Sequence, residues 1–392
     1  MSIPAYPLVF VHGLFGWGAD EGIDKKIPYW GATTGNLMEF LAAQGAECYS
    51  ASVGPVSSAW DRACELYARL TGTKVDYGKA HAERFNHNRF GRTYEEPLFE
   101  GWSSEKKIHL IGHSFGGTTV RLLSHLLTYG DKAEQEATPE AELSPLFKGG
   151  HGDWVQSLTT ICAPHNGAVA FHVAQKYKIL SVMKTVAYNY IGIAGRSKMQ
   201  GDFVDFHLEQ YGLSDTPGKE DALPMGRAKR KFSKNEDNVE YDMSPDGAKK
   251  LNDYVEINPE CYHFSYAFNS VVQGKVRHPK NTDFFFLKAT SGLILADNFL
   301  FRKGREDHDV MNDGLVEVSS ALHPDDEPFT DFDENNVNKG IWNVFPVQEG
   351  DHGTPIGLFA DPEKTHEFYL NLLDLLFKTE QFDRKPMETA HD

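Results

Sequence analysis

Short hydrophobic runs alternate along the chain with segments of helical periodicity. The runs at 6–11, 107–112, 158–162 and 262–268 are too short for helices, and most end at Gly, Ser or Pro, which is typical of buried parallel strands. After the second run, Val120, Leu123 and Leu127 follow the spacing of an apolar helix face, and a last helix is expected after Asp361-Pro362. Strands that alternate with helices predict an α/β fold, with a mostly parallel central sheet and helices on both faces.

Two segments, about 54–105 and 167–258, are longer than ordinary connections of roughly 2–6 residues. We interpret the chain as one domain, 1–392, in which these segments are insertions that carry function. The second insertion holds an apolar stripe at helical spacing, formed by Ile179, Val182, Met183, Val186 and Tyr190. Such a stripe most often packs on a core.

The charge balance is acidic, with Lys+Arg 39 against Asp+Glu 56 and a net charge of −17. This balance argues against nucleic acid as a partner, because phosphate backbones are bound by basic patches. The four cysteines are scattered and form no CxxC pair, so we interpret them as small buried residues. The N-terminus lacks the features of a signal peptide, and no apolar run reaches membrane-spanning length. We therefore expect either an intracellular protein or a mature form without its leader.

A candidate nucleophile lies between the second strand and the helix that follows it. Gly112-His-Ser-Phe-Gly116 matches the pattern G-x-S-x-G. The pattern alone is weak and could be a simple loop, but a strand before it and a helix after it predict a strained turn that exposes the hydroxyl of Ser114.

A serine of this kind needs a histidine to remove its proton and an acid to orient that histidine, in the chain order Ser, acid, His. His352 lies just before the closing helix, whereas His366 falls inside it. For the acid we prefer Asp313, in Asn312-Asp-Gly314, although an isolated Asp-Gly is usually an ordinary turn. Three other candidate acids have no such turn beside an apolar run: Asp297, Asp307 and Asp309.

Acyl transfer also needs backbone N–H groups directed at the oxyanion that forms. One is expected from Phe115, the residue after the nucleophile. The other is expected from the loop after the first strand, from Leu14 or alternatively from Phe15.

Several blocks of the sequence resemble the secreted triacylglycerol lipases of Geobacillus and their staphylococcal relatives. The resemblance extends from about Pro7 to the last helix, and it is carried by Val11-His-Gly-Leu-Phe-Gly-Trp17, Tyr29-Trp-Gly31, Val53-Gly-Pro-Val-Ser-Ser-Ala-Trp-Asp-Arg-Ala63, Val75-Asp-Tyr-Gly78, Phe90-Gly-Arg-Thr-Tyr94, Gly112-His-Ser-Phe-Gly-Gly117 and Tyr241-Asp-Met-Ser-Pro-Asp-Gly-Ala248. It implies an α/β-hydrolase with an inserted helical lid, a triad of Ser114, Asp313 and His352, and an oxyanion hole from Leu14 and Phe115. The apolar stripe would then cover the cleft when closed and meet lipid when open.

The resemblance also implies a structural zinc ion in an extra domain formed by the insertions, with Asp61, His81, His87 and Asp242 as ligands. Taken alone, Asp61 would be interpreted as a surface ion-pair partner and Asp242 as a helix cap. Calcium near Asp361 is a further expectation from the resemblance, but Thr354 stands where relatives place a carboxylate, and fewer oxygen ligands weaken such a site.

The predicted function is therefore hydrolysis of neutral esters with apolar acyl chains at a lipid–water interface, through an acyl-enzyme. The resemblance favours an extracellular location. A short-chain carboxylesterase, thioesterase or peptidase would use the same triad, and a non-catalytic binding protein would leave Ser114 without a role. No pattern in the sequence indicates the preferred acyl-chain length, the preferred ester position on glycerol or the oligomeric state.

Overall fold

The fold is described from a computed structural model that covers residues 2–168, 205–212, 235–272, 275–276, 291–292 and 311–384. The apolar stripe from Ile179 to Tyr190 and the alternative acids Asp297, Asp307 and Asp309 lie outside these residues. None of the helices in the described ranges is long and apolar enough to cross a membrane.

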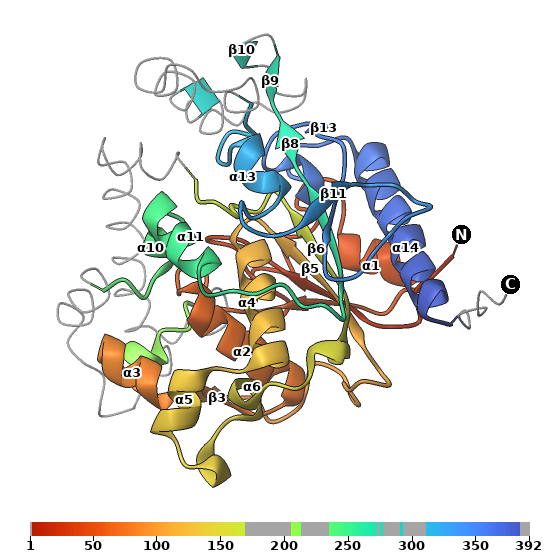
Figure 1. The fold of residues 1–392 in the computed structure, drawn as a ribbon. Helices are drawn as coiled ribbons and strands as arrows, with labels where there is room; N and C mark the ends of the chain where they lie inside the picture. Colours follow the sequence, from red (N-terminus) through yellow and green to blue (C-terminus); the bar gives the residue numbers. More distant parts are fainter. Residues whose placement is uncertain are drawn as a thin grey trace, which may run out of the picture.

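A seven-stranded sheet forms the centre of the molecule (Figure 1), in the order β11-β12-β7-β6-β5-β1-β2. All neighbouring pairs in this sheet are parallel. The strands are β1 (Leu8–Val11), β2 (Cys48–Ala51), β5 (Ile108–His113), β6 (Val155–Ile161), β7 (Tyr262–Tyr266), β11 (Phe329–Asp331) and β12 (Trp342–Val344). The predicted parallel α/β architecture is therefore present, and four of these strands coincide with the hydrophobic runs of the sequence.

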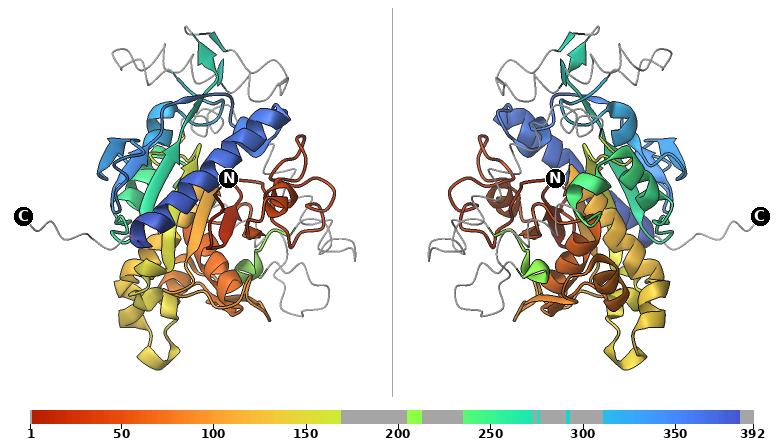
Figure 2. Two further views of the ribbon diagram at one scale, coloured as in Figure 1. Left: turned by 90° about the vertical axis from the view of Figure 1, so that its right-hand side faces the viewer. Right: turned by 90° about the vertical axis from the view of Figure 1, so that its left-hand side faces the viewer.

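Helices cover both faces of the sheet, as expected. One face carries α1 (Leu37–Ala43) and α14 (Pro362–Arg384), and α14 runs diagonally across it (Figure 2). The other face carries α2 (Ala59–Thr71), α4 (Phe115–Tyr129), α6 (Pro145–Lys148) and α11 (Pro245–Asn252). The remaining described α-helices are α3 (Lys79–Phe85), α5 (Lys132–Ala137), α10 (Val239–Asp242) and α13 (Val318–Leu322).

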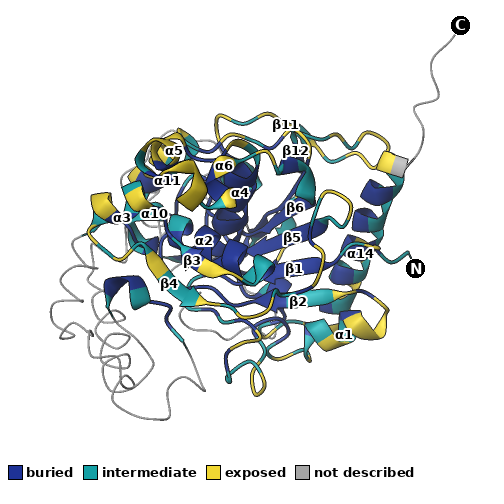
Figure 3. Cartoon of the chain, turned by 90° about the horizontal axis from the view of Figure 1, so that it is seen from below, coloured by how far each residue is buried: buried dark blue, intermediate teal, exposed yellow. Residues whose placement is uncertain are grey.

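The alternation of side chains along each strand divides the interior into two cores. In β1, Val9 and Val11 belong to the core beneath α2 and α4, whereas Leu8 and Phe10 belong to the core beneath α1 and α14. Successive side chains of a strand point to opposite faces, so a strand buried on both faces is mostly hydrophobic along its whole length. The buried strands between the two helical layers are visible in Figure 3. Each fully buried Val, Leu or Phe contributes about 1.5–3 kcal/mol relative to exposure.

The first insertion does not stand apart from this core. It begins with α2, which buries Ala63, Leu66 and Leu70 in the core shared with α4. It continues with the antiparallel pair β3 (Lys74–Asp76) and β4 (Phe90–Thr93), with α3 between them. Two further small sheets pair β8 (Phe268–Asn269) with β13 (Gln348–Glu349), and β9 (Val271–Val272) with β10 (Lys275–Val276).

Candidate active site

Ser114 occupies a sharp turn between the central strand β5 and helix α4. Its φ and ψ of 55° and −129° lie outside the conformations that most residues adopt. The turn is closely packed, because a Cβ on Gly112 would lie 2.5 Å from the backbone of Gly116, and a Cβ on Gly116 would lie 2.1 Å from the carbonyl oxygen of Val11. Glycine on each side therefore lets the chain hold the serine above the carboxyl end of the sheet.

Replacing Gly116 with alanine is expected to lower the free energy of unfolding by about 1–3 kcal/mol, because the new Cβ must displace backbone of β1. Denaturant unfolding checks this value. Gly292→Ala is the matched control, since Gly292 is also helical without a positive φ and no atom lies within 4 Å of the added Cβ. An equal loss in both variants would mean that close packing at the turn is unimportant.

Asp313 and His352, separated by 39 positions, meet in a direct hydrogen bond. His352 Nδ1 lies 2.7 Å from Asp313 Oδ2, and the carboxylate is 1% exposed. The other carboxylate oxygen, Oδ1, accepts the N–H groups of Leu315 and Val316 at 2.9 and 2.8 Å. Asp313 thus forms an ordinary Asp-Gly turn with one oxygen and holds the histidine with the other.

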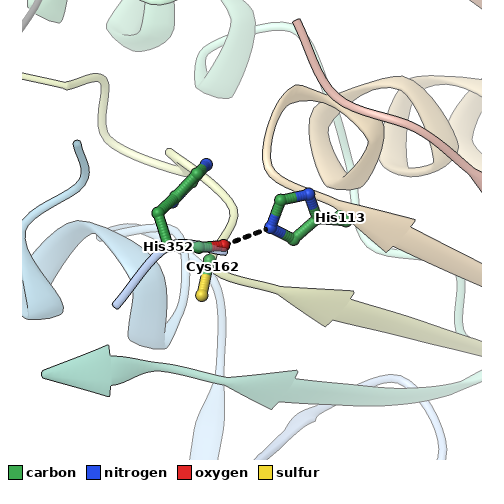
Figure 4. A group of neighbouring side chains, drawn as sticks. All are labelled: His113, Cys162 and His352. Atoms are coloured by element: carbon green, nitrogen blue, oxygen red, sulfur yellow. Dashed lines mark hydrogen bonds between the residues drawn. The ribbon is translucent and has the colours of Figure 1, made fainter. Parts of the chain in front are cut away.

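His352 lies close to the serine turn. Its ring centroid is 4.8 Å from that of His113, the residue before Ser114, and His113 Nε2 donates to the carbonyl oxygen of His352 at 2.9 Å (Figure 4). Because Nδ1 faces Asp313, Nε2 is the ring atom left for the serine. Within the described part of the chain no hydrogen bond joins Ser114 Oγ to His352, whose ring is held by Asp313.

Cys162 lies beside this pair and is fully buried. It follows β6 with a φ of 54°, and its thiol lies within 4.8 Å of ring nitrogens of His113 and His352. Burial and the neighbouring Asp313 carboxylate raise the pKa of the thiol well above its usual value. These residues do not form an open metal site, because both ring nitrogens of His113 and Nδ1 of His352 already have hydrogen-bond partners.

The loop after β1 approaches the serine from the other side. A Cβ on Gly13 would lie 2.8 Å from Ser114 Cβ, so the loop passes directly over the nucleophile. The N–H of Phe15, whose φ is 54°, donates to the carbonyl oxygen of Pro55 at 3.0 Å. This bond engages Phe15 elsewhere, which leaves Leu14 as the better candidate donor for an oxyanion. Phe115 stands at the first position of α4, where a helix N–H has no partner within the helix.

Arg62 supports this loop from helix α2. Its fully buried guanidinium donates to the carbonyl oxygens of His12 and Gly54 and to the hydroxyl of Thr119. Burial lowers the pKa of Arg62 to about 10, so the group stays charged at neutral pH. It links the loop to helices α2 and α4 through charge-assisted hydrogen bonds.

A second cluster, formed by three residues of the first insertion and one of the second, could hold a metal ion. Asp61 in α2, His81 in α3, His87 after α3 and Asp237 before α10 bring one ligand atom each to within 4.8 Å of one another. His81 Nε2 lies 3.5 Å from Asp61 Oδ1 and 3.2 Å from Asp237 Oδ1, and His87 Nε2 lies 3.3 Å from Asp237 Oδ2.

The donor atoms of this cluster fit a metal ion. Asp61 Oδ1, His81 Nε2, His87 Nε2 and Asp237 Oδ1 are buried and none has a hydrogen bond of acceptable geometry. Such buried polar atoms are costly unless something else satisfies them. The other atoms are held in place: Gln210 donates to Asp61 Oδ2 at 2.7 Å, and His87 Nδ1 donates to the carbonyl oxygen of Asn88 at 2.8 Å. Four buried atoms that face one another, two of them on side chains fixed by a second hydrogen bond, are the arrangement that a tetrahedral ion requires.

Within the cluster, His81 and His87 on one side and Asp237 on the other stabilise each other's charged forms, whereas burial and the charge of Asp237 raise the pKa of Asp61. Burial lowers the pKa of His81, but the charges of Asp237 and Asp61 outweigh it and raise the pKa to about 9. Burial favours the neutral acid at Asp237, but His81 and His87 outweigh it and lower the pKa.

The fourth residue of the cluster is Asp237 and not Asp242, so the sequence-based choice of Asp242 was wrong in this respect. Asp242 is half-buried nearby, but its Oδ2 accepts the N–H of Ala59, the first residue of α2, at 2.7 Å. It therefore caps that helix instead of joining the histidines. Asp237 is the last residue of a charged segment that precedes α10. Nothing in the neighbouring sequence marks it as a metal ligand.

Asp361 directly precedes α14, the position expected of a residue that caps this helix. Its Oδ1 accepts the N–H of Glu363 at 2.9 Å. In the ranges that the structure describes, no group of three or more His, Cys, Asp or Glu ligands includes it. The geometry thus gives calcium at Asp361 no support.

The parallel sheet, the strained serine turn and the Asp–His pair beside it place the molecule in the α/β-hydrolase class. A family model described as "Lipase-like, C-terminal domain" matches residues 4–387, and the chain belongs to this family.

Individual relatives agree with this assignment. "Lipase 2" of Staphylococcus aureus is 35% identical over 393 residues, which cover 97% of this chain and 55% of that protein. The crystal structure of Staphylococcus hyicus lipase superposes with a TM-score of 0.81 at 33% identity and covers 97% of both chains. The structure of EstA from Clostridium botulinum gives a TM-score of 0.76 at 33% identity, with 96% of this chain and 88% of that one covered. The chain spans about half the length of the curated relatives that it matches.

Proposed function

We propose that this protein is a serine carboxylic-ester hydrolase of the lipase or esterase type. The observation that carries the proposal is the 2.7 Å bond between His352 Nδ1 and Asp313 Oδ2 beside a serine held at a φ of 55°. The relatives named lipases support the same reaction class.

The proposed reaction proceeds through an acyl-enzyme. Ser114 Oγ attacks the ester carbonyl carbon while His352 Nε2 accepts its proton, and Asp313 stabilises the resulting imidazolium. The N–H groups of Leu14 and Phe115 stabilise the oxyanion. The alcohol then leaves with the proton from His352, and water, activated by the same nitrogen, hydrolyses the acyl-enzyme to release the acid.

We further propose neutral esters with apolar acyl chains at a lipid–water interface as substrates, and the apolar stripe of 179–190 as the lid over them. The resemblance to secreted lipases supports an extracellular location for this reaction.

For the metal cluster we propose a structural zinc ion held by Asp61, His81, His87 and Asp237. Two imidazoles and two carboxylates suit Zn²⁺, and four protein ligands leave no position open for substrate. The ion would join the first insertion to the segment before α10, with the insertions at about 54–105 and 167–258 forming one extra region.

The proposal is tested by labelling with a fluorophosphonate probe and by hydrolysis of a series of p-nitrophenyl esters of increasing acyl length. We expect the wild type and Ser124→Ala, a buried serine further along α4, to be labelled, and Ser114→Ala not to be. Emulsified triglyceride, a thioester and a peptide complete the substrate set. Absence of labelling in the wild type would overturn the function, and faster thioester or peptide hydrolysis would change its substrate class.

A further inference from the structure

Tyr29 is a buried tyrosine that the triad does not use. Its ring is 8% exposed, and its hydroxyl lies 3.0 Å from the nitrogen of Gly13 and 2.7 Å from Nδ1 of His113. Gly13 belongs to the loop after β1, and His113 immediately precedes the candidate nucleophile. The hydroxyl thus bridges two of the loops that meet at the candidate active site.

The direction of each hydrogen bond follows from the partners. His113 Nε2 lies 2.9 Å from the carbonyl oxygen of His352, and a carbonyl can only accept, so Nε2 carries the hydrogen. Nδ1 of the neutral ring is then an acceptor, and the hydroxyl of Tyr29 donates to it. The hydroxyl oxygen in turn accepts the N–H of Gly13. Burial and the nearby His352 lower the pKa of His113 well below its usual value, which agrees with a neutral ring.

The three bonds form one buried chain, from Gly13 through Tyr29 and His113 to His352. Its members come from positions far apart in the sequence, and all except Tyr29 are, or directly precede, a proposed catalytic residue. Gly13 precedes Leu14, His113 precedes Ser114, and His352 is the proposed base. Hydrogen bonds that follow one another in a low-dielectric interior strengthen each other.

The packing around Tyr29 is an independent indication that the loop is built to receive this ring. A Cβ on Gly16 would lie 2.6 Å from Tyr29 Cε2, and a Cβ on Gly13 would lie 3.1 Å from its hydroxyl oxygen. Edge-on contacts with Trp17 and Trp30, at centroid distances of 5.8 and 5.4 Å, hold the ring from other sides.

We propose that Tyr29 and His113 are positioning residues that hold the oxyanion loop and the loop of the catalytic histidine in register with Ser114. The inference rests on the proposed function and deepens it. Neither residue touches the substrate; both act through the backbone of Gly13 and His352. Displacements of about 1 Å at such positions can lower turnover about 100-fold.

The test compares steady-state hydrolysis of a soluble p-nitrophenyl ester by the full chain and its variants. Tyr29→Phe removes the hydroxyl and keeps the ring, and we expect kcat to fall about 10- to 100-fold with KM changed less than about 2-fold. Tyr262→Phe is the matched control. It is also a buried tyrosine, and its hydroxyl bonds Asp383 at 3.0 Å, but it lies at the start of β7, away from the triad; its kcat should stay at the wild-type value.

Substitutions at His113 test the same chain from its other side. His113→Gln keeps one donor and one acceptor and should retain more kcat than His113→Leu, which keeps neither. Tyr29→Phe combined with His113→Leu should lower kcat little further than His113→Leu alone, because both break one chain. The comparison of His113→Gln with His113→Leu also tests the chain if Tyr29→Phe folds poorly.

The two proposals fail in different ways. If the wild type reacts with the fluorophosphonate but Tyr29→Phe has the kcat of Tyr262→Phe, or His113→Leu matches His113→Gln, the positioning role is overturned and the hydrolase function stands. If the wild type does not react, the hydrolase function itself is overturned.

Discussion

The Asp313→Asn variant is expected to lose about 10⁴-fold in kcat while it keeps its fold and its KM for a soluble ester. The reason lies in how the two carboxylate oxygens are used. Oδ1 accepts two backbone N–H groups, so an asparagine must keep its amide oxygen there and turn its NH₂ toward His352. A donor facing Nδ1 favours the tautomer with hydrogen on Nε2, and that nitrogen can no longer accept the proton of Ser114.

Steady-state kinetics and thermal unfolding check this result together. Asp131→Asn is a matched control, because Asp131 is also buried and also accepts one backbone N–H, from Glu134, and one side-chain hydrogen bond, from Tyr254. Its kcat should be unchanged. A kcat for Asp313→Asn within about tenfold of the wild type would remove Asp313 from the triad and return attention to Asp297, Asp307 and Asp309.

Loss of the metal ion is the second large effect we expect. With free zinc at about 1,000 times its dissociation constant, binding stabilises the fold by about 4 kcal/mol, and a chelator should remove that contribution. Asp237→Asn should lose the zinc and unfold with the stability of the chelated protein, because one of the four facing ligands is gone.

Metal analysis of protein purified without added zinc, with denaturant unfolding in zinc and in chelator, measures both outcomes. His81→Ala should behave like Asp237→Asn. Asp242→Asn should retain its zinc, because the Asp242 carboxylate bonds the N–H of Ala59. Zinc retained by Asp237→Asn and lost from Asp242→Asn would reinstate the sequence-based assignment.

The contrast between Asp237 and Asp242 shows what a sequence can and cannot predict. Ser114, Asp313 and His352 could be selected because each stands in a recognisable local context, at a strand end, a turn or the loop before the last helix, and because their order is fixed by the fold. The parallel sheet was predictable because strands buried on both faces are mostly hydrophobic. These signals are local.

The two aspartates are only five positions apart in a polar segment, and nothing local separates a ligand from a cap. The choice depends on where α2 begins relative to α10, which only the packed structure provides. The chain from Gly13 through Tyr29 and His113 to His352 is equally hidden, because its four residues come from four separate segments of the sequence. The choice between Leu14 and Phe15 as the oxyanion donor likewise depends on the tertiary structure, because it rests on the hydrogen bond from the N–H of Phe15 to the carbonyl oxygen of Pro55.

Three residues around the candidate active site, Phe15, Ser114 and Cys162, share a left-handed backbone with φ of 54°, 55° and 54°. Glycine tolerates this region without penalty, so a change to glycine at any of them would relax the chain while it deletes a side chain. Directed evolution that rewards only survival of heating would therefore enrich inert clones with glycine at position 114. Heat-tolerant catalysts from this scaffold need a turnover screen in every round of selection.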